Sequence, residues 1–121
     1  MSQAMKEYFR QKLSRWREEI LDESNDTLQS LQQESLHESD LADRASLEAE
    51  RSVVLRTRDR QRKLIAKIED ALRRIENGTY GLCAETGEPI SLKRLEARPI
   101  ATLSVDAQEM HERLEKTHRD D

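Results

Sequence analysis

The sequence is poor in chain-breaking residues, in aromatic residues and in cysteine. Its three glycines and two prolines leave few positions for turns, and its four aromatic residues are too few for a β-sandwich or barrel. No apolar run is long enough to span a membrane, and no signal peptide precedes the first polar segment. A single cysteine, Cys83, excludes an internal disulfide. These absences together predict a cytoplasmic protein.

Charge is what the sequence has in excess. Charged residues make up 38% of the 121 residues, whereas hydrophobic residues make up 35%. Such a composition is typical either of long helices or of a disordered chain, and the periodicity of the apolar residues distinguishes the two. The net charge of −4 argues against direct DNA binding, because affinity for nucleic acid comes largely from lysine and arginine on phosphates.

Two apolar stripes with helical spacing indicate two long helices. The first stripe recurs every three or four residues, at Met5, Phe9, Leu13, Trp16 and Ile20. The second runs from Leu47 to Ile75, but the same spacing places Arg58 and Gln61 in its middle. A polar stretch in an apolar seam weakens packing and can fix the register of the two helices.

The segment between the stripes, residues 39–45, contains the signals of a helix start. Asp40 is a favourable N-cap, and Asp43 follows three residues later at the capping-box position. Two helices joined by so short a connection fold back antiparallel. Residues 17–50 carry a net charge of −9 and residues 51–74 a net charge of +6, so the two arms attract each other and favour this orientation.

The chain changes character after Asn77-Gly78, a dipeptide that favours the end of a helix. Residues 79–104 contain the remaining glycines and both prolines, and we expect a small knob with short extended pieces. Ser104 is positioned to cap a last helix from Val105 to about Thr117, with Met110 and Leu114 packed on the first helix.

The predicted fold is mainly all-α: a long antiparallel coiled-coil hairpin, a small globular knob and a C-terminal helix. We expect three parts: residues 1–15 as the start of the first helix packing on the knob, residues 16–76 as the hairpin with its tip at 39–45, and residues 77–121 as the knob and last helix.

The residues alone do not predict an enzyme. No nucleophile–base arrangement or phosphate-binding glycine loop is present, and the three histidines lack metal-ligand spacing. A zinc ribbon needs two pairs of ligands, each pair two residues apart. The positions with this spacing are Cys83, Thr86, Ser104 and Ala107. Only Cys83 could hold zinc, so the chemistry predicts a metal-free turn region.

Several blocks of the chain together resemble the DksA/TraR family of bacterial transcription factors. They are Phe9, Leu13 and Trp16, residues 40–45, residues 58–65, the Tyr-Gly-Leu-Cys run at 80–83, and the Arg-Leu-Glu-Ala-Arg-Pro run at 94–99. The resemblance covers nearly the whole sequence, and the last block is the most specific. A helical hairpin alone would be weak evidence, but these blocks in this order are strong.

The resemblance implies a transcription regulator that binds RNA polymerase rather than DNA. In the family, the hairpin enters the secondary channel of the polymerase and its tip alters the stability of promoter complexes. The tip pattern that this action needs is present as Asp40, Asp43 and Ala45. The alternative is that Asp40 and Asp43 only cap the second helix.

The resemblance also implies an effector, guanosine tetraphosphate (ppGpp), bound at the polymerase interface in the stringent response. Leu64, Lys67 and Arg98 match the family positions that contact it. A further family position, usually lysine, is Gln108 here, so the strength of the ppGpp response stays open. The competing interpretations are a solvated helix position for Lys67 and a structural tie of Arg98 to Glu96 or to a helix end.

Within the family, the chain resembles the cysteine-poor members that replace the zinc-containing form when zinc is scarce or thiols are oxidised. Cys83 keeps the first ligand position, but Thr86, Ser104 and Ala107 replace the other three. We therefore expect a zinc-independent monomer without a bound prosthetic group. Two alternatives stay open: a zinc- or thiol-dependent redox sensor of the same family, and a structural coiled-coil adaptor that acts through oligomerisation.

Overall fold

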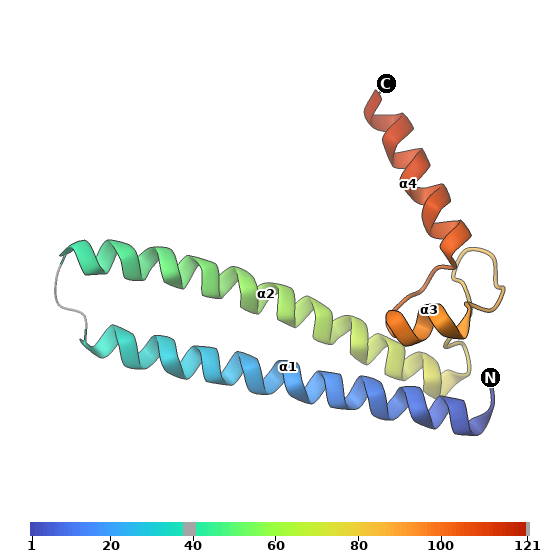
Figure 1. Cartoon of the computed structure of the whole chain (residues 1–121), viewed down its shortest axis with the longest axis horizontal. Coiled ribbons are helices and arrows are strands. Elements are labelled where there is room, and N and C mark those ends of the chain that lie inside the picture. The colour runs from blue at the N-terminus through green and yellow to red at the C-terminus, as the bar shows by residue number, and fades with distance from the viewer. Residues whose placement is uncertain (38–40, 121) are drawn as a thin grey trace. The chain divides into compact units, whose positions relative to one another are not determined.

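The computed structural model describes residues 1–37 and 41–120, apart from the side chains of residues 30–37, 41–44, 119 and 120. Its four helices are α1 (Gln3–His37), α2 (Leu41–Asn77), α3 (Leu92–Ala97) and α4 (Val105–Asp120) (Figure 1). The chain forms two compact units. Residues 14–69 are the hairpin unit, and residues 1–13 with 70–121 are the terminal unit. In the described part of the chain, no helix is both long and apolar enough to span a bilayer.

The hairpin unit consists of the later part of α1 and the earlier part of α2, which run antiparallel side by side (Figure 1). The predicted helical hairpin is therefore confirmed. Its described core is small, because only Ile20, Leu47 and Ile68 are buried. These residues belong to the two apolar stripes of the sequence, which the helical repeat brings to the facing sides of α1 and α2.

The middle of the hairpin seam is polar, as the sequence predicts. The Nε of Arg58 and the Oε1 of Gln61 are buried, and neither has a hydrogen-bond partner among the described residues. A buried polar atom without a partner loses its hydration without compensation, and this costs about 1–3 kcal/mol. The seam is therefore weakest between its apolar ends.

The described ion pair between the two arms does not join an acid of the acidic arm to a base of the basic arm. Among the described residues, the one ion pair between the helices of this unit joins Arg17 of α1 to Glu69 of α2 at 3.1 Å. It therefore pairs a base of the acidic arm with an acid of the basic arm. Both side chains are more than one-third exposed, so the pair contributes little to stability.

Among the described side chains, the terminal unit has the larger core. Its buried apolar residues come from every one of its segments: Phe9, Leu13, Ala71, Ile75, Tyr80, Cys83, Ile90, Leu95, Ala101 and Ala107. Phe9 lies at the centre of an aromatic cluster, with its ring 5.1 Å from that of Tyr8 and 5.6 Å from that of Tyr80. Edge-to-face and tilted aromatic pairs add to the stabilisation that comes from burial alone.

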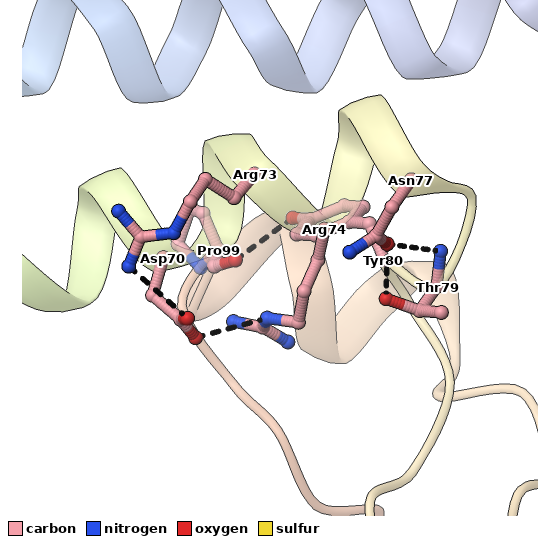
Figure 2. Close-up of polar contacts among 7 residues, drawn as sticks. All are labelled: Asp70, Arg73, Arg74, Asn77, Thr79, Tyr80 and Pro99. Atoms are coloured by element: carbon pink, nitrogen blue, oxygen red, sulfur yellow. Dashed lines mark hydrogen bonds and ion pairs between the residues drawn. The ribbon is translucent and has the colours of Figure 1, made fainter.

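The end of α2 is fixed by glycine and by side-chain hydrogen bonds. α2 ends at Asn77, and Gly78 has a φ of +83°, so the predicted left-handed cap is confirmed. The Asn77 side chain accepts hydrogen bonds from the backbone N–H and the hydroxyl of Thr79 (Figure 2). Tyr80 then turns inward, and its hydroxyl donates to the buried carbonyl of Pro99 at 2.8 Å.

The knob is more helical than the sequence suggests. Extended structure in the described knob is limited to one isolated bridge between Leu82 and Pro89. Residues 92–97, expected among the extended pieces, instead form α3. Ser91 caps this helix by accepting a hydrogen bond from the N–H of Arg94 at 3.2 Å, and Leu95 is fully buried beneath it. A helix this short is marginal by itself and depends on its cap and on packing against the rest of the unit.

The last helix begins where the sequence predicts but packs differently. Ser104 accepts a hydrogen bond from the N–H of Ala107 at 3.2 Å, which confirms it as the cap of α4. The expected packing of Met110 and Leu114 on the first helix is wrong, because these side chains are 55% and 54% exposed. Of the α4 side chains that the structure describes, only that of Ala107, in the first turn, is buried.

Candidate functional site

The three residues predicted for the hairpin tip lie at the edge of the described structure. Asp40 lies outside the described residues. Asp43 belongs to the first turn of α2, and Ala45 follows it with an exposed side chain. The helix start predicted after Asp40 is confirmed, since α2 begins at Leu41. The roles assigned to the three tip residues stay predictions.

The predicted effector residues are divided between the two units. Leu64 and Lys67 lie one turn apart on α2 in the hairpin unit, and Leu64 is half-buried while Lys67 is exposed. Arg98 lies in the terminal unit at the C-terminal end of α3. Lys67 and Arg98 are both exposed residues, as a contact with a phosphate group requires.

The backbone around Arg98 is held at several points. The N–H of Arg98 donates to the carbonyl of Arg94 at 2.7 Å, and the carbonyl of Arg98 accepts from Ala101 at 3.0 Å. The next residue, Pro99, accepts the Tyr80 hydroxyl (Figure 2). The Arg98 side chain itself is exposed and makes no hydrogen bond or ion pair within the described ranges 1–37 and 41–120. The segment therefore presents an unengaged cation on a fixed backbone.

Among the described residues, no hydrogen bond or ion pair joins Arg98 to Glu96, and the Glu96 carboxylate instead contacts two residues of α1. Its Oε1 accepts the Tyr8 hydroxyl at 2.5 Å and the Lys12 ammonium at 2.8 Å. The same ammonium donates to the backbone carbonyl of Glu96 at 2.8 Å. These donors lower the pKa of Glu96, the contact with Lys12 having the larger effect. The Glu96 carboxylate in turn raises the pKa of Tyr8.

The four positions with zinc-ribbon spacing come together in the terminal unit. The thiol of Cys83, which is 2% exposed, lies against the hydroxyl of Thr86 and the backbone N–H groups of Ser104, Thr86 and Glu85. Ala107 is also buried and donates its N–H to the Ser104 hydroxyl. The hydrogen bonds from Thr86 and then from Ser104 stabilise the thiolate and lower the pKa of Cys83 to about 6.

Close to this cluster, the imidazole of His111 on α4 contacts Glu85, which lies in the turn before α3. His111 Nε2 lies 2.6 Å from Glu85 Oε1. The hydrogen bond and the charge of Glu85 raise the pKa of His111, and the charges of Glu115 and Cys83 raise it further. Sequence reasoning missed this contact, as well as that of Tyr8 and Lys12 with Glu96, because each joins residues far apart in the chain with no shared motif.

Comparisons with known proteins match almost all of this chain. Residues 5–75 match the family described as the N-terminal domain of the DnaK suppressor protein DksA, and residues 78–113 match the prokaryotic dksA/traR C4-type zinc finger. The RNA polymerase-binding transcription factor DksA of Caulobacter vibrioides is 64% identical over 121 residues, which cover 100% of this chain and 85% of that protein.

Two further relatives extend the comparison. The protein of the same name from Escherichia coli K12 is 42% identical over 116 residues, covering 96% of this chain and 77% of that protein. The solved structure of transcription factor DksA2 from Pseudomonas aeruginosa is 42% identical and has a TM-score of 0.88. That match covers 95% of this chain and 88% of the solved one. The fold is therefore the one found in that solved relative.

The residues of this chain do not fit the zinc ion that a C4-type finger implies. Structural zinc takes four ligands, usually thiolates or imidazoles, whereas the four positions here carry one thiol, two hydroxyl groups and a methyl group. Among the residues that the structure describes, no group of three or more histidine, cysteine or acidic side chains gathers in a metal-binding arrangement. The Ala107 N–H donates to the Ser104 hydroxyl, and Cys83 is buried close to Thr86 and Ser104.

Proposed function

This chain belongs to the DksA/TraR family, and from that premise we propose that it is a regulator of transcription that binds RNA polymerase and is not itself an enzyme. The observation that carries the proposal is the match to relatives named RNA polymerase-binding transcription factors over nearly its full length. The helical hairpin suits this role, since it supplies a long, charged rod. The protein would act as a monomer in the cytoplasm, through the polymerase rather than through DNA.

The proposed mechanism places the hairpin in the secondary channel of the polymerase. Asp40, Asp43 and Ala45 then lie near the catalytic centre, where carboxylates act on a cationic, metal-containing environment and the small Ala45 permits close approach. Promoter complexes change stability as a result. ppGpp strengthens this effect when Leu64, Lys67 and Arg98 contact it at the polymerase interface, because the two cations neutralise its phosphates.

Replacing Asp43 by asparagine tests the tip. We expect Asp43→Asn to bind polymerase as the wild type does and to lose its effect on run-off transcription from a ribosomal RNA promoter. Glu48→Gln is the matched control, because it removes one carboxylate from an exposed position of the same helix. Full activity of Asp43→Asn would show that the tip residue has been assigned wrongly.

We further propose that the protein works without zinc, during zinc limitation or oxidative stress. One thiol among the four family ligand positions supports this proposal. Transcription reactions with and without a chelator should give equal activity, and elemental analysis should find no stoichiometric zinc. Stoichiometric zinc in the purified protein, or loss of activity on chelation, would overturn the proposal.

A second candidate function is a thiol-dependent redox sensor of the same family. The lowered pKa of Cys83 favours it, because the thiolate is the form that oxidants attack. The 2% exposure of the side chain opposes it, since reagents need access to the sulfur. If peroxide alters the activity of the wild type but not that of Cys83→Ser, the result would favour the redox sensor over the zinc-independent regulator.

A further inference from the structure

The hairpin unit carries two stripes of opposite charge, one on each helix. The members of each stripe recur every three or four residues, which places them along one side of their helix, and all of them are exposed. The acidic stripe on α1 consists of Glu19, Asp22, Glu23 and Asp26. The basic stripe on α2 consists of Arg56, Arg60, Lys63 and Lys67. Both stripes lie within residues 14–69.

The two stripes lie on the same face of the hairpin. Glu19 immediately precedes the buried Ile20 of the seam, and Lys67 immediately precedes the buried Ile68. One residue step turns a helix by about 100°, so Glu19 and Lys67 each lie beside the seam. The antiparallel helices wind in opposite senses when viewed from one end, and they turn opposite sides toward the seam (Figure 1). Residues that precede the seam on α1 and on α2 therefore share one face.

The stripes also lie at the same height along the hairpin. The contact of Arg17 with Glu69, at 3.1 Å, fixes the level of one helix against the other. Asp26 follows Arg17 by nine residues, and Arg60 precedes Glu69 by nine residues. Because both helices rise by about 1.5 Å per residue, Asp26 and Arg60 are level. The acidic stripe therefore runs alongside the basic stripe.

The stripes do not neutralise each other within one chain. Among the residues that the structure describes, no hydrogen bond or ion pair joins a member of one stripe to a member of the other. The basic stripe makes contacts within α2, such as that of Lys63 with Asp59 at 3.2 Å and that of Arg60 with Thr57 at 3.5 Å. One face of the hairpin thus presents a row of acids and a row of bases to the outside.

We propose that this face binds a second copy of the chain, in a two-fold symmetric dimer where the acidic stripe of each copy lies over the basic stripe of the other. A two-fold axis along the hairpin places α1 of one copy over α2 of its partner at the same height, so opposite charges meet throughout. An axis across the hairpin would place like charges over each other. The complementarity of the face to itself is the argument for this occupant, and the inference goes beyond the proposed function.

We expect a weak dimer, because the face is mainly charged. Exposed ion pairs contribute little individually and are screened by salt. Val53, which is 53% exposed and lies one turn before Arg56 on the same face, adds an apolar contact. The dimer covers Lys67, so the contact with ppGpp proposed above belongs to the monomer.

Sedimentation velocity of the full chain, from about 10 µM to about 1 mM protein, tests the proposal. The dimer dissociation constant of the wild type should rise when the salt concentration is raised from about 0.01 M to about 0.15 M, because the screening length falls from about 30 Å to about 8 Å. In low salt, Asp26→Lys alone and Arg60→Glu alone should each raise this constant about tenfold, since each reverses two contacts of the symmetric dimer.

An equal mixture of Asp26→Lys and Arg60→Glu is the decisive sample. In a dimer that contains one copy of each variant, both contacts again join opposite charges, so the dissociation constant should return to within about threefold of the wild-type value. Contacts within one chain could not produce this rescue. The matched controls are Glu18→Lys and Arg62→Glu, which make the same charge changes at exposed positions outside the stripes and should leave the constant within about twofold. Circular dichroism checks that every variant is helical.

The other outcomes overturn the inference. A wild type that stays monomeric at every concentration in low salt excludes the dimer. A mixture that fails to restore association shows that the stripes do not face each other in any dimer that forms. If the wild type is monomeric and Asp26→Lys and Arg60→Glu weaken binding to RNA polymerase, the polymerase occupies this face. In that case the inference is wrong and the proposed function stands.

Discussion

The hairpin unit and the terminal unit build helical structure by different means. In the hairpin unit, the three apolar residues buried among the described side chains are separated by a polar seam. In this seam, the Nε of Arg58 and the Oε1 of Gln61 have no hydrogen-bond partner in the described part of the chain. The terminal unit combines an aromatic cluster with ten buried apolar residues and with hydrogen bonds such as that from Tyr80 to Pro99. The terminal unit therefore fixes individual side chains, whereas the hairpin unit provides length and charge.

The two units hold the proposed effector residues in position in different ways. Lys67 lies exposed on a regular helix and needs no neighbour other than the helix itself to hold its position. Arg98 lies outside regular structure, at φ −137° and ψ 83°, and its position depends on hydrogen bonds from its neighbours. A residue of the second kind is sensitive to substitutions at a distance in the sequence.

The largest effect expected from this comparison follows from shortening a buried leucine in each unit. Leu95 of the terminal unit is 0% exposed and Leu47 of the hairpin unit is 7% exposed. We expect Leu95→Ala to lower the free energy of unfolding by about 3–5 kcal/mol and Leu47→Ala by about 2–3 kcal/mol. The reason is that the cavity created at the fully buried Leu95 would be more enclosed than the cavity created at Leu47. Urea unfolding followed by circular dichroism measures both values. A larger loss for Leu47→Ala would reverse the comparison.

A smaller effect, of the opposite sign, is expected in the polar seam. Gln61→Leu replaces a buried acceptor that has no partner by an apolar side chain of similar size, so it should raise the free energy of unfolding by about 1–2 kcal/mol. Ala66→Leu adds a leucine at an exposed position of the same helix and should change stability little. Destabilisation by Gln61→Leu would show that Gln61 has a partner in solution, such as water.

A further difference concerns the pH dependence of stability in the terminal unit. The folded-state pKa of Cys83, about 6, lies below the ordinary value of 9.0. Its contribution to stability is therefore complete above 9.0 and is lost as the pH falls to about 6. The difference in unfolding free energy between the wild type and Cys83→Ala should widen from pH 6 to pH 9. A constant difference would contradict the hydrogen bonding of the thiolate.

His111 should act in the opposite direction within the same unit. Because Glu85 raises the pKa of His111, the contribution of this pair is present below 6.5 and is lost as the pH rises through the raised value. Glu85→Gln should bring the His111 titration, followed by NMR, closer to that of an ordinary histidine.

Thr86→Val is the companion variant, because it should raise the pKa of Cys83 by removing the first of its hydrogen bonds.

The long helices were predictable from the sequence because their signals are local. The spacing of Phe9 and Leu13, the helix start after Asp40 and the Asn77-Gly78 end each depend on a few neighbouring residues, and the structure places α1 and α2 accordingly. The six residues of α3 gave no such signal. They are too few to show a period, and the helix depends on the Ser91 cap and on burial of Leu95.

The positions of side chains at the candidate site were not predictable in the same way. The apolar pattern of α4 identifies Met110 and Leu114 as a face but cannot say what covers it, and both are exposed. The contacts of Glu96 with Tyr8 and Lys12 join residues more than eighty positions apart. The roles of Asp40 and Arg98 come from the family resemblance and stay predictions.

The polar atoms of Arg58 and Gln61 that have no partner among the described residues also bear on the stiffness of the hairpin. A pair of helices resists bending through the close packing of its apolar seam, so a polar stretch in the seam lowers the work needed to bend it there. The apolar contacts at Leu47 and Ile68 lie on either side of this stretch and can persist while it flexes. The ease with which the hairpin bends thus depends on the side chains of Arg58 and Gln61. Substitutions at these two half-buried positions would tune it.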